Sequence, residues 1–391
     1  MVNIAILCIL WFGGWQVQIG SVSQGQIVAL VNYMNQILLA LVALGFAASA
    51  LVSMKAVQWL FDHARGYTCY AVLGFLLVSV ALVFPGFGSG WMLWAQLAAL
   101  LAGGHCLLQG VPGLAKTLLV QSLGQALALD FRRVQFTPDL MPGDITGSDI
   151  LDEEPGSGRR ELRFIPGPVF TNLLLADEIN RAVPRTQSAL LEAMEERQVT
   201  IDGETLPLPT PFVVMATQNP VEMEGTFPLP EAQLDRFMFL IKLTYPERDQ
   251  EITILRETTG NSRPQPQPVL DAEMLLRFQK SVRSIPVSDH VIAYCADLAR
   301  MSRPENPDAP DFIRENLSYG AGPRAGQYLL LAARAAAALE GRINVSCADV
   351  RRFAPEVLRH RIACNFHAVG ENLTSDILVG KLLEAVPESA E

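Results

Sequence analysis

Three short apolar runs in this chain each end on a polar group, and this repeated arrangement restricts the fold more than any other feature. LLLADEIN ends in the carboxylates Asp177 and Glu178, VVMATQN ends in Asn219, and a third run leads into the loop GVPGLAKT at 110–117. Continuous apolar runs are typical of buried parallel strands, whose carboxyl ends line the crevice of an open α/β sheet. We therefore predict a parallel α/β sheet with a phosphate loop, an acidic pair and an amide in one crevice.

The loop at 110–117 has the composition of a site that binds phosphate. Backbone amides of such a loop, and of the helix that follows it, surround phosphate oxygens. In this pattern a lysine reaches the terminal phosphates and a Ser/Thr hydroxyl binds Mg²⁺, roles that suit Lys116 and Thr117. The strict pattern has glycine before the lysine, where this chain has Ala115, so the loop alone leaves a chance match open.

Asp177 and Glu178 favour a nucleotide-cleaving site over a chance match. An Asp that follows an apolar strand holds Mg²⁺, and an adjacent Glu can orient and deprotonate the attacking water. A solvated acidic pair at a strand end is the common alternative. The succession of loop, acidic pair and Asn219 favours cleavage of a nucleoside triphosphate, with Thr117 and Asp177 as magnesium ligands.

Charge divides the chain into two unequal parts. Residues 1–105 carry Lys55 and Arg65 against Asp62, a formal charge of +1. Residues 106–391 therefore carry a formal charge of −11, and the two parts sum to the total of −10. So acidic a part argues against nucleic acid as a partner, because phosphate backbones attract basic surfaces. The six cysteines show no CxxC spacing, which favours reduced cysteines over disulfides or a metal site.

The first hundred residues have the composition of membrane-spanning helices. Residues 4–19 and 27–53 contain no charged side chain, and 67–86 is a third uncharged segment. A segment of about twenty apolar residues is long enough to cross a bilayer. Buried helices of a soluble protein are the alternative. We therefore expect the N-terminal region to attach the protein to a membrane.

The orientation of these segments stays open at the sequence level. Lys55 and Arg65 favour a cytoplasmic loop between the second and third segments. If 67–86 spans the bilayer, everything after it faces outward, away from ATP. A hairpin of 67–86 with 88–104, or a third segment that lies on the membrane, would keep the following domain in the cytoplasm.

The stretch LWFGGWQVQIGSVSQGQIVALVNYMNQILLALVAL resembles the last two transmembrane helices of bacterial ABC exporters, over about residues 3–50. The exporter family's Q-loop and LSGGQ signature are absent from the sequence, which excludes a complete exporter. An alternative interpretation is therefore a fusion of an exporter fragment with a truncated ATPase. Such a protein would be an inactive membrane scaffold or would have no function.

The rest of the chain resembles MoxR-type AAA+ ATPases over about residues 95–365. The resemblance rests on GHCLLQGVPGLAKT, VQFTPDLMPGDITG, GPVFTNLLLADEINRAVPRTQSALLEAMEERQVTI, PFVVMATQNPVEMEGTFPLPEAQLDRF and YGAGPRAGQYLLLAARAAAALEGR. It implies an αβα P-loop ATPase core followed by a helical lid. It also implies a homo-oligomeric ring, expected to be a hexamer, with the nucleotide between subunits.

The resemblance assigns a role to individual residues. Lys116 and Thr117 match the Walker A pair, Asp177 and Glu178 the Walker B pair, and Asn219 the sensor 1 residue. The implied cofactors are ATP and Mg²⁺, and the expected nucleotide-binding residues are Gly110, Val111, Pro112, Gly113, Leu114, Ala115, Lys116, Thr117 and Asp177.

Two arginines also match motifs of the family. Arg236 in LDRF resembles the arginine finger, which would reach the γ-phosphate bound to the neighbouring subunit. Arg324 in GPRA resembles the sensor 2 residue of the lid. Cations near that phosphate stabilise the negative charge that spreads in the transition state. Without the family context, an ion-pairing role is the ordinary expectation for either arginine.

We predict three domains: membrane-like helices at 1–90, the ATPase core at 91–260 and the lid with its tail at 261–391. A Pro/Gln-rich linker precedes the lid. WMLWAQLAALLAGGH resembles the end of the family's upstream region, but the V-G-Q-E-like segment near the adenine is missing, which puts adenine binding in doubt. EEPGSGRRELRF resembles a family insertion, and a plain surface hairpin is an equal alternative.

The resemblance implies an ATPase that remodels or matures a client protein, often with a von Willebrand factor A domain partner. We expect it to be membrane-associated with the ATPase domain in the cytoplasm. In the helix predicted around TQSALLEAMEERQ, Glu195 is expected on a solvated face or at a subunit contact, not in catalysis. His360 and His367 lack the spacing of a metal site and are predicted to be ordinary surface residues.

Overall fold

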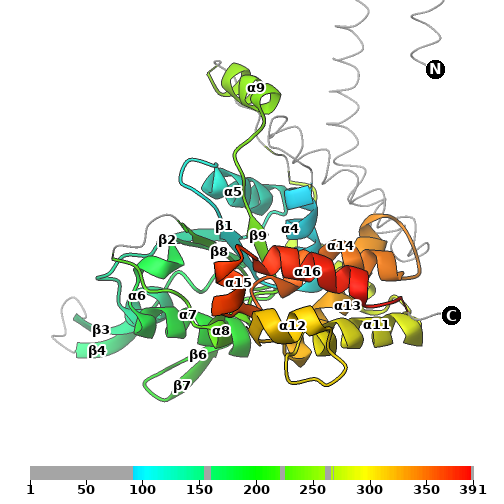
Figure 1. Ribbon diagram of the computed structural model, residues 1–391. Coiled ribbons are helices and arrows are strands. Elements are labelled where there is room, and N and C mark those ends of the chain that lie inside the picture. The colour runs from blue at the N-terminus through cyan, green and yellow to red at the C-terminus, as the bar shows by residue number, and fades with distance from the viewer. Residues whose placement is uncertain (1–90, 154–159, 221–224, 260–265, 267, 389–391) are drawn as a thin grey trace, which may run out of the picture. The chain divides into compact units, whose positions relative to one another are not determined.

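The computed structural model describes residues 91–153, 160–220, 225–259, 266 and 268–388 (Figure 1). The predicted transmembrane segments, and the segment that resembles an exporter, fall within residues 1–90 and lie outside the described residues. Among the described helices, none has the length and apolar character needed to cross a membrane.

The ATPase part alternates strands and helices. Its strands are β1 (Cys106–Gln109), β2 (Phe131–Gln135), β3 (Gly147–Glu153), β4 (Arg160–Pro166), β5 (Leu173–Asp177), β6 (Gln198–Ile201), β7 (Glu204–Pro207), β8 (Val213–Gln218) and β9 (Phe239–Lys242). Its helices are α4 (Trp91–Ala102), α5 (Lys116–Ala126), α6 (Pro142–Thr146), the 3₁₀ turn η1 (Ile179–Arg181), α7 (Pro184–Glu196), α8 (Glu231–Leu234) and α9 (Arg248–Thr258).

Five strands form the central sheet, in the order β2-β5-β8-β1-β9, and all neighbouring pairs are parallel. Every residue of β5 and the first five residues of β8 are buried. Strands covered on both faces read as continuous apolar runs, which explains why these segments were recognisable in the sequence. The predicted parallel α/β sheet is confirmed.

Helices cover both faces of this sheet (Figure 1). On one face, Leu190 and Met194 of α7 belong to a core cluster with Leu174 of β5 and Val214 of β8. On the other face, α5 contacts β2 and β5, and a Cβ at Gly124 would lie 3.2 Å from that of Phe131. The αβα layering that the family resemblance implied is therefore present.

A helical lid follows the sheet. It consists of α10 (Ala272–Arg283), α11 (Asp289–Met301), α12 (Asp311–Asn316), α13 (Pro323–Leu339), α14 (Cys347–Leu358), α15 (Phe366–Gly370) and α16 (Ser375–Ala385), with the short strands β10 (Leu317–Tyr319) and β11 (Ala363–Cys364). The predicted boundary near 260 falls in residues outside the described part. Ser346 caps α14 in a box with Asp349, and Gly341 follows α13 at φ +82°.

Helix α4 corrects one alternative for the N-terminal region. It contacts α10, α13 and β9, and its residues 95–102 are all buried in the protein. A membrane hairpin of 67–86 with 88–104 would need that same apolar helix in lipid. The helix instead completes the ATPase unit, in agreement with the resemblance of WMLWAQLAALLAGGH to the family's upstream region.

Two antiparallel hairpins leave the core. β3 pairs with β4 on either side of residues 154–159, which lie outside the described residues, and this pairing agrees with the hairpin that we considered beside a family insertion. β6 pairs with β7 directly after α7.

Candidate active site

The phosphate loop connects β1 to α5, as its sequence predicted. Gly113 has φ +86°, and a Cβ built on it would have no atom within 4 Å, so the loop is open at that position. Ala115 adopts φ +48°, a left-handed conformation that glycine adopts without strain. Helix α5 begins at Lys116, so its N-terminal amides and positive dipole end lie at the loop.

The Lys116 ammonium lies inside this loop. Its Nζ donates a hydrogen bond to the carbonyl oxygen of Gly110 at 2.6 Å. Burial lowers the pKa of Lys116, while the negative charges of Asp177 and Glu178 oppose this shift. The electrostatic coupling places the lysine in the field of both acidic residues, as the sequence pattern required.

Asp177 collects hydrogen bonds from three directions at the end of β5. Thr217 Oγ1, on the adjacent strand β8, donates to Oδ1 at 2.6 Å. Thr117 Oγ1 lies 3.4 Å from Oδ2, and the Arg133 guanidinium binds the same oxygen at 2.7 Å. The carboxylate thus lies between the phosphate loop and the strand β2.

Glu178 follows Asp177 in a left-handed conformation with φ +56°. Its backbone N–H donates to Thr217 Oγ1 at 2.8 Å. Its side-chain Oε2 accepts a hydrogen bond from Gln135 Nε2 at 2.9 Å and pairs with Arg181 Nε at 2.9 Å. Non-glycine residues in this conformation concentrate at functional sites. Both carboxylates contact side chains of β2, Asp177 that of Arg133 and Glu178 that of Gln135.

Asn219 is brought to the same edge by strand register. In the β1–β8 pair, Gln109 lies opposite Gln218, and the Gly110 N–H donates to the Gln218 carbonyl at 3.2 Å. The residue after Gln218 is therefore level with the start of the phosphate loop, and Asn219 is buried there. Lys116, Thr117, Asp177, Glu178 and Asn219 thus share one edge of the sheet.

The residues at this edge fit magnesium and a polyphosphate. Magnesium takes oxygen ligands, and the hydroxyl of Thr117 and the carboxylate of Asp177 are oxygen donors within reach of each other. A cluster of three or more His, Cys, Asp or Glu side chains suited to holding a metal unaided is not found among the described residues. A magnesium ion shared with phosphate oxygens needs only one or two protein ligands.

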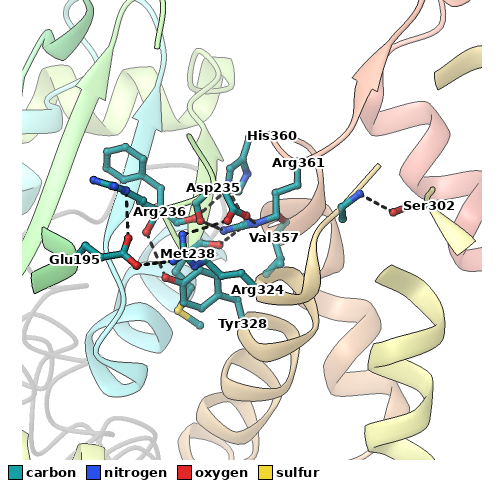
Figure 2. A network of polar contacts seen from close by, with 12 residues as sticks. Glu195, Asp235, Arg236, Met238, Ser302, Arg324, Tyr328, Val357, His360 and Arg361 are labelled. Atoms are coloured by element: carbon teal, nitrogen blue, oxygen red, sulfur yellow. Dashed lines mark hydrogen bonds and ion pairs between the residues drawn. The ribbon is translucent and has the colours of Figure 1, made fainter. Parts of the chain in front are cut away.

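The two candidate arginines lie in a second cluster, at the junction of core and lid (Figure 2). Arg236 Nε pairs with Glu195 Oε2 at 3.2 Å, and Arg324 Nη2 pairs with Glu195 Oε1 at 2.6 Å. Arg324 also reaches Asp235 at 3.2 Å. The structure thus places both arginines on one carboxylate. Glu195, predicted on a solvated or subunit-contact face, is a ligand of both.

Four polar partners of the acidic pair were not predicted: Arg133, Gln135, Arg181 and Thr217. Gln135 is the last residue of β2 and lies opposite Asp177. Thr217 is the polar residue within the apolar run of β8. The presence of a polar residue at the carboxyl end of a strand was the available signal. Reading FRRVQ as a strand beside β5 would have revealed two of them.

The prediction for His360 is wrong. The side chain is buried, its Nε2 lies 3.0 Å from the Phe237 carbonyl, and burial followed by the charge of Arg361 lowers its pKa. His367 is exposed and pairs with Glu371 at 3.7 Å, as predicted for a surface residue. Periodicity alone did not show that VLRHRI turns back onto the core.

Sequence comparisons agree with this architecture. Residues 105–239 match the family described as ATPase family associated with various cellular activities (AAA). Residues 312–379 match the AAA lid domain. The first match contains the phosphate loop, the acidic pair and Arg236, and the second contains Arg324.

Several known proteins are similar to most of this chain. The uncharacterised protein YeaC of Bacillus subtilis is 42% identical over 74% of this chain and 87% of its own length. Chaperone MoxR1 of Mycobacterium tuberculosis is 41% identical over 76% of this chain and 78% of its own. A crystal structure of a Cytophaga hutchinsonii protein assigned as an ATPase has a TM-score of 0.77 and 36% identity, and covers 85% of this chain and 99% of that one. These similarities support an ATPase and not an inactive scaffold, and the chain belongs to the MoxR family of AAA+ ATPases.

Proposed function

We propose that this ATPase hydrolyses Mg·ATP at the edge formed by the phosphate loop, Asp177, Glu178 and Asn219. The observation that carries the proposal is the hydrogen-bond chain from Thr117 through Asp177 and Thr217 to the Glu178 amide. Bound magnesium would neutralise charge on the phosphates. Thr117 and Asp177 would hold it from the protein side.

The remaining residues of the edge have separate tasks. Lys116, which bonds a loop carbonyl here, would turn to the terminal phosphates and balance their charge. Glu178 would accept a proton from the attacking water once Gln135 and Arg181 release its Oε2. Asn219 would hold the water or the γ-phosphate in line.

Arg236 and Arg324 would act on the nucleotide of a neighbouring subunit in a homo-oligomeric ring, expected to be a hexamer. In support, both arginines share Glu195 at the core–lid junction. A neighbour's γ-phosphate would replace Glu195 as their common anion. Such cations stabilise the charge of phosphoryl transfer.

The hydrolysis would drive chaperone-like remodelling or maturation of a client protein. The similarity to Chaperone MoxR1 supports this, since it extends over more than three quarters of that protein. A von Willebrand factor A domain protein is the partner that we propose. The uncharged segments within residues 1–90 would hold the ring at the membrane with its ATPase domain in the cytoplasm. Fractionation of cells with and without residues 1–90 tests that attachment.

The test of the ATPase site is Glu178→Gln in the purified full-length protein. We expect turnover to fall by on the order of a thousandfold while nucleotide remains bound, because the proton acceptor is lost and the phosphate ligands are kept. Glu192→Gln, on the exposed face of α7, is the matched control and should keep full turnover. Undiminished turnover in Glu178→Gln would contradict the proposed site.

A further inference from the structure

Arg361 is fully buried at the core–lid junction (Figure 2). The family resemblance assigned no role to this residue. Its Nε donates to Asp235 Oδ1 at 2.8 Å, and its Nη2 donates to the carbonyls of Asp235 at 2.7 Å and Phe237 at 2.6 Å. Its Nη1 donates to the carbonyls of Met238 at 3.3 Å and Val357. All five N–H groups of the guanidinium therefore have an acceptor.

The acceptors on the core side are consecutive. Arg361 binds the carbonyls of residues 235, 237 and 238, and Tyr328 Oη donates to the remaining one, the Arg236 carbonyl, at 3.3 Å. The guanidinium carbon lies 5.0 Å from the Tyr328 ring centre, so the two lid side chains support each other. The lid thus holds every backbone carbonyl of the segment that carries Arg236.

Stability alone does not account for such an arrangement. Burying an ion pair costs desolvation energy, and well-packed apolar residues often serve stability as well or better. Burial lowers the pKa of Arg361, with Asp235 opposing the shift, and an arginine stays charged in proteins. Apolar packing could not fix the direction of the four backbone carbonyls of residues 235–238, nor that of the Arg236 side chain that this segment carries.

We infer that Arg361, supported by Tyr328, is a positioning residue that sets the backbone of Asp235–Met238 and thereby aims Arg236 at the nucleotide of the neighbouring subunit. Asp235 extends the effect to Arg324, because its two carboxylate oxygens bind Arg361 and Arg324 separately. This inference rests on the proposed role of Arg236 in the ring. It adds that the lid of the same subunit, through Arg361, determines whether that arginine is in position.

The test uses Arg361→Lys. Lysine keeps a positive charge beside Asp235, but a single ammonium replaces the guanidinium, which donates to four backbone carbonyls. We expect kcat to fall about tenfold to a hundredfold, since a displacement of about 1 Å can cost that much. Affinity of the variant's own site for a fluorescent ADP should change by less than about twofold, because the phosphate loop is untouched.

Arg342→Lys is the matched control for a purely structural role. Arg342 is also a lid arginine, and it pairs with the buried Asp349 and with Glu340, both within the lid. Its substitution should leave kcat within about twofold of the unmodified protein. If the two variants lose the same fraction of kcat and of thermal stability, Arg361 is a structural residue and the inference is wrong.

Mixed assemblies separate the inference from the proposed function. Full-length Arg361→Lys is mixed with Glu178→Gln, which lacks turnover but keeps a correctly held Arg236. Turnover above the sum of the two alone is expected, since sites of Arg361→Lys subunits then receive a good arginine. Arg236→Ala mixed with Glu178→Gln should recover in the same way.

Each outcome of the mixing is decisive. If Arg236→Ala recovers and Arg361→Lys does not, Arg236 acts between subunits but Arg361 does not aim it, and the inference fails alone. If Arg236→Ala does not recover, the proposed role of Arg236 fails, and the inference falls with it. A wild-type kcat for Arg361→Lys would also overturn the inference.

Discussion

The phosphate-loop edge and the core–lid junction are both built from arginines and carboxylates, yet they differ in how fully these groups are committed. At the edge, the Arg133 side chain that binds Asp177 is 46% exposed, and Lys116 contacts a loop carbonyl. At the junction, the Arg361 side chain is fully buried and satisfied by protein alone. The first set of contacts can be exchanged for ligand, whereas the second can serve as a fixed frame.

The largest difference should appear when one cation is removed from each region. Lys116→Ala should lower kcat/KM by on the order of a thousandfold and weaken nucleotide binding, because its charge balances bound phosphate in the same subunit. Arg324→Ala should lower kcat with nearly unchanged nucleotide affinity. Steady-state kinetics and ADP titration measure both.

Lys381→Ala, an exposed lysine of α16, is the control for loss of a positive charge and should behave as the unmodified protein. If Arg324→Ala weakens nucleotide binding as much as Lys116→Ala does, the two regions form one site, and the comparison fails.

Acid should destabilise the sheet at the amino end of β1, opposite the phosphate loop, and also the core–lid junction. Burial lowers the pKa of His105 to about 4, and burial followed by the charge of Arg361 lowers that of His360. Both rings resist protonation in the folded chain, but an unfolded chain protonates them below about pH 6.5. The contribution of these two histidines to the free energy of unfolding is therefore fully present above about pH 6.5. It is lost as pH falls toward 4, and the loss from His105 alone is about 3 kcal/mol.

Melting temperatures between pH 7.5 and 4.5 check this prediction. His105→Gln and His360→Gln should each make the melting temperature less dependent on pH. A slope that neither buried variant alters would mean that other groups govern acid unfolding.

A smaller effect is expected for metal use at the edge. Arg133→Gln removes a cation from the carboxylate that we propose for magnesium, so half-maximal ATPase activity should need about threefold less Mg²⁺. The neighbouring Arg132→Gln is the control, because successive residues of a strand point to opposite faces. A higher magnesium requirement in Arg133→Gln would show that this arginine assists the bound complex.

The smallest effect concerns the departure from the strict phosphate-loop pattern. Ala115→Gly removes the left-handed strain of Ala115 and should stabilise the protein by less than about 1 kcal/mol, or about 2 °C in melting temperature. Ala128→Gly, at φ +44° after α5, should give a similar shift. Only Ala115→Gly should also alter nucleotide affinity. An equal change in nucleotide affinity in the two variants would mean that alanine at position 115 has no specific effect on nucleotide binding.

The sequence allowed the sheet edge to be predicted well because its signals are local. The strands β1, β5 and β8 are apolar runs, and Lys116, Asp177 and Asn219 follow directly from motifs. The junction was not predictable in that way, since Arg361 and Asp235 lie 126 residues apart in the chain. Nothing in VLRHRI distinguishes a buried arginine from an exposed one until the lid is folded against β9.

Helix α7 has a further consequence for a ring. It starts just after the turn that holds Glu178 and carries Glu195 near its other end, and 13 residues make a rigid rod of about 20 Å. One end of this helix is therefore close to Glu178, and the other is bound through Glu195 to Arg236 and Arg324. In the proposed ring, a change at Glu178 when phosphate leaves would be transmitted along α7 to Arg236 and Arg324, which face the neighbouring subunit in that proposal.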